Sequence, residues 1–161
     1  MNYYDINYNN ITKIYINNNP ILIVQQPKNS NTYVSLCYDI ITQFMQPLIQ
    51  YGNIVLLAHN TMCGQNFYSL KINDEVIVEY KNGDRVKYCV NQIKQYQALE
   101  PENLQSNFID LETSNKLTVG ELFDSIYGGE NKLVLQTCLE KDGNSEWGRY
   151  FVIAFPQTNK I

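Results

Sequence analysis

The residues of this chain with the clearest chemical potential lie at the ends of apolar segments. Cys138 ends the segment 132–138, and His59, the single histidine, directly follows the segment 53–58. Arg149 opens another apolar run. The length and branched side chains of these segments are typical of buried strands. We expect the strand ends to meet, so that one thiol, one imidazole and one guanidinium share a site.

Such a trio is suited to acyl transfer. Cysteine attacks as its thiolate, so the site has to supply a cation or a base beside the thiol. An imidazole such as that of His59 protonates a leaving amine and then deprotonates an incoming nucleophile. A guanidinium such as that of Arg149 stays charged and holds a substrate carbonyl or a developing oxyanion. We therefore predict a catalytic site formed by Cys138, His59 and Arg149.

The segments around these residues predict a mainly β protein. Glu75–Tyr80 alternates apolar and polar residues, Asn82 and Gly83 are typical of a tight hairpin turn, and the segment 85–90 returns. Strands recur at short spacing with few helices between them. This pattern favours a closed or nearly closed β-barrel.

Two helices are predicted within this β-rich chain. Apolar residues at helical spacing predict an amphipathic helix over residues 37–49, with Pro47 disturbing its last turn. Thr118 and Glu121 have the spacing of a capping box, and Gly128 is expected to end the helix that they begin.

The length of 161 residues and the 44% hydrophobic content indicate one domain. We predict a polar N-terminal arm over residues 1–19 and a catalytic domain over residues 20–161. The net charge of -4 offers no basic patch, so we expect no nucleic-acid partner. The apolar runs are much shorter than the roughly 20 residues of a membrane span, so we expect no membrane segment in this chain.

The four cysteines are not arranged as a metal site. They lack C-x-x-C spacing and have one histidine to join them, which argues against zinc, and the acidic residues lack the pattern of a calcium loop. We expect no metal and no cofactor. Two disulfides are arithmetically allowed, but Cys37 and Cys89 are predicted to be small buried hydrophobic residues, and Cys63 to lie exposed in a polar turn.

Three segments, in this order along the chain, resemble the sortases. They are Ala-His-Asn at 58–60, Leu-Gln-Thr-Cys at 135–138, and a last strand that begins with Gly-Arg-Tyr-Phe at 148–151. The order of histidine, cysteine and arginine differs from that of papain-like proteases, and the sequence around Cys138 differs from that of caspases. The resemblance covers residues 20–156.

The resemblance implies a closed eight-stranded β-barrel with a few short helices and a bacterial cysteine transpeptidase. It implies that Cys138 attacks the carbonyl after the threonine of an LPxTG-like sorting signal and forms a thioester. His59 would be the general acid and base, Arg149 would steady the oxyanion, and Thr137 would help the oxyanion site. The implied partners are the sorting-signal peptide of a surface protein or pilin and an amine from a peptidoglycan precursor or a pilin lysine. The implied location is the outer face of the bacterial cell surface, if an anchor precedes this sequence.

Two other functions remain open on the same residues. A hydrolytic cysteine peptidase on this scaffold would release an acid whether or not an amine is present. A non-catalytic barrel would bind peptides without a reaction. Taken singly, Cys138 has the ordinary interpretation of buried packing, His59 of a hydrogen-bonded surface residue and Arg149 of a solvated charge.

Overall fold

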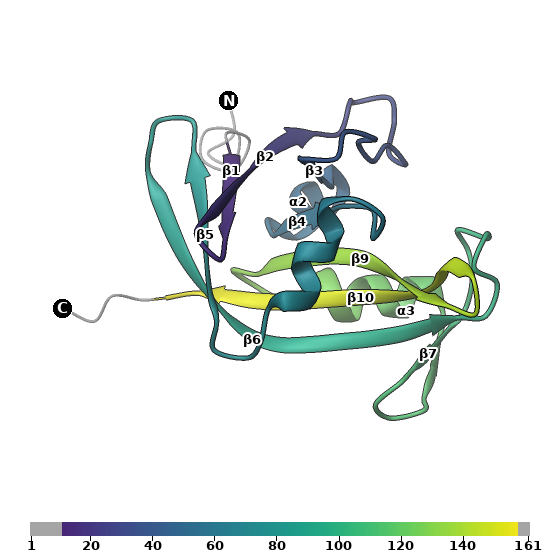
Figure 1. Cartoon of the computed structure of the whole chain (residues 1–161). Coiled ribbons are helices and arrows are strands. Elements are labelled where there is room, and N and C mark those ends of the chain that lie inside the picture. Colours follow the sequence, from purple (N-terminus) through teal and green to yellow (C-terminus); the bar gives the residue numbers. More distant parts are fainter. Residues whose placement is uncertain (1–10, 158–161) are drawn as a thin grey trace.

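The computed structural model describes residues 11–157, in which ten strands form one continuous sheet (Figure 1). The helical elements in this range are α2 (Met45–Tyr51), the 3-10 helix η1 (Cys63–Ser69) and α3 (Val119–Tyr127). The strands are β1 (Ile11–Ile16), β2 (Asn19–Gln25), β3 (Ile40–Gln43), β4 (Ile54–Leu57), β5 (Glu75–Tyr80), β6 (Arg85–Ala98), β7 (Phe108–Asp110), β8 (Lys116–Leu117), β9 (Leu133–Lys141) and β10 (Asn144–Pro156).

The sheet closes on itself, as the predicted barrel requires. Its strand order is β10-β9-β4-β3-β2-β1-β5-β6-β7-β8, and β6 also pairs with β10. The ring therefore contains eight strands from β10 round to β6, and the β7–β8 hairpin extends from it. The β2–β3 and β4–β9 pairs are parallel, whereas the other pairs of the ring are antiparallel. The prediction of a closed eight-stranded barrel is confirmed.

Two local predictions are also confirmed. Strands β5 and β6 form an antiparallel hairpin, and Gly83 in its turn has φ of 90°. Helix α3 begins with the predicted capping box, in which the Thr118 side chain accepts from the Glu121 backbone N–H and the Glu121 side chain accepts from the Thr118 backbone N–H. Gly128 follows the helix directly.

The predicted helix over residues 37–49 is wrong in its first half. Residues Ile40–Gln43 form β3, which lies between β2 and β4 in the sheet, and the helix α2 begins at Met45. The run Ile-Ile-Thr favours a strand, and pairing with neighbours on both sides outweighs the helical spacing of the apolar residues. Pro47 consequently lies in the first turn of α2, where a proline is tolerated, and not in the last turn.

The predicted polar arm over residues 1–19 also needs correction. Ile11–Ile16 form β1, a strand of the barrel wall that pairs with β2 and β5, and the Ile14 side chain is fully buried. Ile14 and Ile16 are buried on either side of Tyr15, the alternation of a half-buried strand, and the register is irregular between Ile11 and Lys13. The first ten residues lie outside the described range.

Two apolar clusters occupy the two faces of the long strands. The cluster inside the barrel contains Leu133 and Leu135 of β9 together with Phe67 of η1. The other cluster packs α3 against the outer face and contains Val134 of β9 and Phe151 of β10. In Figure 1, η1 lies in front of these strands and α3 behind them. Because side chains alternate along a strand, each position on β9 and β10 is assigned to one of these faces.

The cysteines depart from their predicted environments. All four are free thiols; Cys37 is exposed and Cys63 is buried within η1, each the reverse of the prediction, while Cys89 is half-buried. The apolar residues near Cys37 belong to the barrel strand that follows it, which leaves Cys37 in an exposed turn. In residues 11–157 we find no helix with the length and apolar character of a membrane span.

Candidate active site

Cys138 and Arg149 are cross-strand partners. They are paired in the antiparallel register of β9 and β10, and both lie on the strand face that carries Val134 and Phe151. Side chains directly opposite each other on one face of an antiparallel pair have Cβ atoms roughly 4.5–5.5 Å apart. The sheet therefore places the thiol and the guanidinium side by side.

His59 follows β4, which runs parallel to β9. The last register pair of the two strands is Leu57 with Gln136, and His59 and Cys138 each lie two residues beyond it. The ladder continues briefly, because the Ala58 N–H donates to the Gln136 carbonyl at 3.2 Å. His59 and Cys138 therefore lie at equivalent positions beyond the last register pair of the two parallel strands.

Thr137 connects these two strand ends through its side chain. Its hydroxyl is buried and donates to the Ala58 carbonyl at 2.7 Å. Thr137 faces the barrel interior, opposite to Cys138. The Thr137 hydroxyl therefore has a buried partner on the strand face opposite to Cys138, and a contribution of Thr137 to the oxyanion site stays a prediction.

A glycine packs tightly against this junction. A Cβ atom built on Gly64 would lie 2.4 Å from the Thr137 hydroxyl and 2.6 Å from the His59 carbonyl oxygen. The same carbonyl accepts from the N–H groups of Met62 and Gly64, at 3.0 and 3.1 Å. The turn after His59 therefore folds back directly onto the strand end, and only glycine fits at position 64.

Two charged neighbours act in opposite directions on the Cys138 thiol. Burial raises the pKa of Cys138, the positive charge of Arg149 lowers it, and the carboxylate of Glu146 raises it again. The net pKa lies above the ordinary value. The half-buried thiol is therefore mostly protonated at neutral pH, and Arg149 is the group that favours its ionised form.

The Arg149 guanidinium is held by backbone carbonyls. Nη1 donates to the carbonyls of Glu146 and Gly148, each at 3.0 Å, and Nη2 donates to that of Pro101 at 3.5 Å. Its Nε has no partner among residues 11–157, so the guanidinium retains an N–H group that can donate to a substrate oxygen. The contact with Pro101 joins the loop after β6 to the site.

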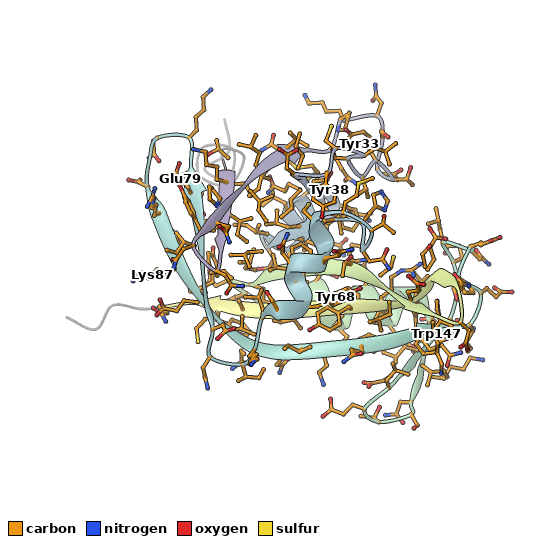
Figure 2. All side chains as sticks on the ribbon, in the orientation of Figure 1. Tyr33, Tyr38, Tyr68, Glu79, Lys87 and Trp147 are labelled. Carbon is orange, nitrogen blue, oxygen red and sulfur yellow. The ribbon has the colours of Figure 1, made fainter. Side chains whose placement is uncertain are left out.

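The segment between Cys138 and Arg149 is a hairpin, with Asp142 and Gly143 both at positive φ in its turn. Lys141 lies over the ring of Trp147, with Nζ 4.8 Å from the centroid, and Figure 2 shows Trp147 at this end of the strands. The turn residues Asp-Gly are typical of a two-residue hairpin turn.

Two polar residues beside the site were missed at the level of sequence. Tyr68 of η1 donates its hydroxyl to the Cys138 carbonyl, and Asn60 donates its side-chain N–H to the Ser145 carbonyl at 3.0 Å. The position of Asn60 next to His59 was the available signal. Tyr68 is 70 residues from Cys138 in the chain, and its sequence context gives no indication of the contact.

The candidate site includes no metal-binding cluster of the described residues, and one hollow of the described chain lies away from it. Among residues 11–157, no group of three or more His, Cys, Asp or Glu side chains is placed to hold a metal ion. A shallow hollow of about 420 Å³ shares no residue with the candidate site. Its lining consists of Asn73, Cys89, Val90, Asn91, Phe155, Pro156 and Gln157.

A barrel with a cysteine and an arginine paired on adjacent strands, and a histidine at the end of a third, defines the class of protein to be compared. The family model of the sortase domain matches residues 11–157. This match covers nearly all of the chain, and the chain therefore belongs to the sortase family.

Solved sortase structures share the fold at low sequence identity. Sortase A of Listeria monocytogenes has a TM-score of 0.57 at 12% identity, over 93% of this chain and 88% of that one. Sortase C1 of Streptococcus agalactiae, solved in complex with MTSET, has a TM-score of 0.55 at 17% identity, over 95% of this chain and 71% of that one. The Clostridium perfringens sortase D5 transpeptidase has a TM-score of 0.55 at 18% identity, over 92% of this chain and 79% of that one. A search of curated proteins returns no match.

Proposed function

We propose that this chain is a cysteine transpeptidase that cleaves an LPxTG-like sorting signal and transfers it to an amine. The observation that carries the proposal is the register pairing of Cys138 with Arg149, at the strand end that His59 also reaches, in a chain of the sortase family. A barrel that only binds peptides has no need of a thiol paired with a cation.

In the first half-reaction the Cys138 thiolate attacks the carbonyl carbon after the threonine of the signal. A C–S bond forms, the C–N bond breaks, and His59 in its protonated form gives a proton to the leaving amine. Arg149 donates to the carbonyl oxygen as it gains charge. The product is a thioester on Cys138.

In the second half-reaction an amine attacks the thioester. His59, now neutral, accepts the proton of the attacking nitrogen, a new C–N bond forms and Cys138 leaves as the thiolate. The enzyme returns to its starting state without a cofactor. We propose an amine from a peptidoglycan precursor or a pilin lysine, and action at the bacterial cell surface, on the basis of family membership.

The experiment is product analysis by mass spectrometry with a panel of LPxTG-like peptides, each incubated with and without a primary amine. Cys138→Ala is the control. The proposal predicts a ligated product that requires both the amine and Cys138. An acid product whose yield does not depend on amine would indicate a hydrolytic peptidase instead. Peptide binding that is equal in the wild type and in Cys138→Ala, with no product, would indicate a binding barrel.

A further inference from the structure

We propose that Asn60 and Tyr68 form a polar bracket that holds His59 and Cys138 in register, and that both act as positioning residues for proton transfer to the leaving amine. The inference rests on the proposed function and adds to it two residues from outside the predicted site. Its basis is a set of hydrogen bonds that joins the turn after His59 to the strand of Cys138.

The bracket is needed because His59 and Cys138 both lie beyond the last register pair of β4 and β9. Strand β4 ends at Leu57, whereas β9 continues for five residues past Gln136, to Lys141. Past this pair, β4 no longer supplies partners to that edge of β9. A backbone carbonyl at such a place needs another donor, and beyond the Thr137–Ala58 hydrogen bond the two chain segments need a further connection.

Tyr68 supplies that donor. Its hydroxyl donates to the carbonyl of Cys138 itself. Its ring packs edge-on against Tyr150 of β10, with centroids 4.9 Å apart and planes at 78°. Figure 2 shows Tyr68 where η1 lies against the long strands. The ring is thus held by β10 while the hydroxyl fixes the backbone of the nucleophile.

Asn60 extends the bracket to the histidine side. It directly follows His59, and its Nδ2 donates to the Ser145 carbonyl in the β9–β10 hairpin at 3.0 Å. Asn60 therefore ties the turn after His59 to Ser145, and Tyr68 of η1, which follows the same turn, is bonded to the backbone of Cys138.

The electrostatics of Tyr68 agree with this arrangement. Burial raises the pKa of Tyr68 and the charge of the Cys138 thiolate raises it further, while the nearby Asn60 side chain acts in the opposite direction. The phenol stays protonated in the neutral range and remains a donor.

The test uses Tyr68→Phe, which removes the hydroxyl and keeps the ring against Tyr150, and Asn60→Ala. Tyr38→Phe is the matched control, since Tyr38 is an exposed tyrosine and its backbone carbonyl, which accepts from the Cys63 N–H, is kept in phenylalanine. Single-turnover acylation is measured with a peptide amide and with the same peptide carrying a thioester at the scissile bond. A thiolate leaving group needs no proton from His59, so only the amide reaction depends on the histidine.

We expect each variant to slow acylation by the amide roughly 10-fold, with KM changed less than twofold, and to leave the thioester reaction within about twofold. The double variant should lose less than the product of the single losses, because both residues belong to one network. Equal losses on amide and thioester, or rates equal to those of Tyr38→Phe, would overturn the proposal.

Hydrogen exchange separates the bracket from the proposed function. We expect backbone amides in residues 59–70 and 138–146 to exchange faster in Tyr68→Phe than in the wild type, at unchanged Tm. If none of the peptides acylates the wild type, the proposed function fails. Faster exchange confined to these two segments would then still support the bracket as a connection between the two strand ends. Unchanged exchange in both segments would overturn the bracket itself.

Discussion

Arg149 lies directly across the β9–β10 ladder from Cys138, and its charge lowers the pKa of the thiol that burial raises. The same guanidinium holds three backbone carbonyls, in the hairpin that follows Cys138 and in the loop after β6. One residue thus combines an electrostatic effect on the nucleophile with a structural one on the segments beside it.

Arg149→Gln should therefore impair both reactivity and turnover. Loss of the positive charge raises the pKa of Cys138, so the pH at which alkylation of this thiol is half-maximal moves upward. Loss of a charged donor to the oxyanion should lower kcat/KM by roughly 10²-fold or more. The pH profile of Cys138 alkylation and the peptide kinetics measure the two effects separately. A downward shift of the profile would contradict the assignment.

Glu146→Gln should act on the thiol in the opposite direction. The carboxylate disfavours the thiolate and raises the pKa of Cys138, so its removal lowers that pKa and moves the alkylation profile to lower pH. Glu146 is exposed, so the shift should be small and should shrink in high salt. Alkylation in low and high salt checks both statements. An unchanged profile at low salt would show that this carboxylate does not influence the thiol.

Gly64→Ala should destabilise the turn behind His59. Its Cβ would lie 2.8 Å or less from the Ala58 carbonyl, the His59 carbonyl and the Thr137 hydroxyl, so the backbone has to move. We expect a loss of about 2 kcal/mol in the free energy of unfolding and reduced activity. Chemical denaturation measures the former. Gly120→Ala is the control: its Cβ is open apart from one atom at 4.0 Å, so stability should be unchanged or raised by roughly 0.5 kcal/mol.

Gln43→Met should stabilise the barrel. Gln43 is fully buried in β3, and neither the nitrogen nor the oxygen of its carboxamide has a partner among residues 11–157. Burying an amide without hydrogen bonds costs free energy, whereas methionine has a similar length and no such requirement. We expect the free energy of unfolding to rise by about 1 kcal/mol. A decrease would mean that the carboxamide is bonded in solution.

The sequence was sufficient for features that depend on near neighbours. The Asn82-Gly83 turn and the Thr118–Glu121 capping box are local arrangements, so their residues predict them directly. The pairing of Cys138 with Arg149 depends on more than the turn. The register shifts between Asn144 and Gly148, so counting outward from the Lys141–Asn144 pair would place Trp147, and not Arg149, opposite Cys138.

The features that were missed depend on distant segments. The strand at Ile40–Gln43 exists because β2 and β4 flank it, although its apolar spacing also fits a helix. Cys63 is buried because η1 packs into the barrel end, which its polar neighbours do not indicate. The contact of Tyr68 with Cys138 likewise follows from the placement of η1. Single-sequence patterns carry no information on which distant element covers which strand.

The most direct test of the central claim is to locate the acyl group after reaction with a sorting peptide. The variant Cys37→Ser removes the exposed thiol and leaves Cys63, Cys89 and Cys138. After rapid acid quenching, intact mass and peptide mapping identify the modified residue. We predict an adduct of the peptide's N-terminal part on Cys138 alone, released by hydroxylamine and lost when amine is added before the quench. An adduct on another cysteine, or turnover that persists in Cys138→Ala, would contradict the account.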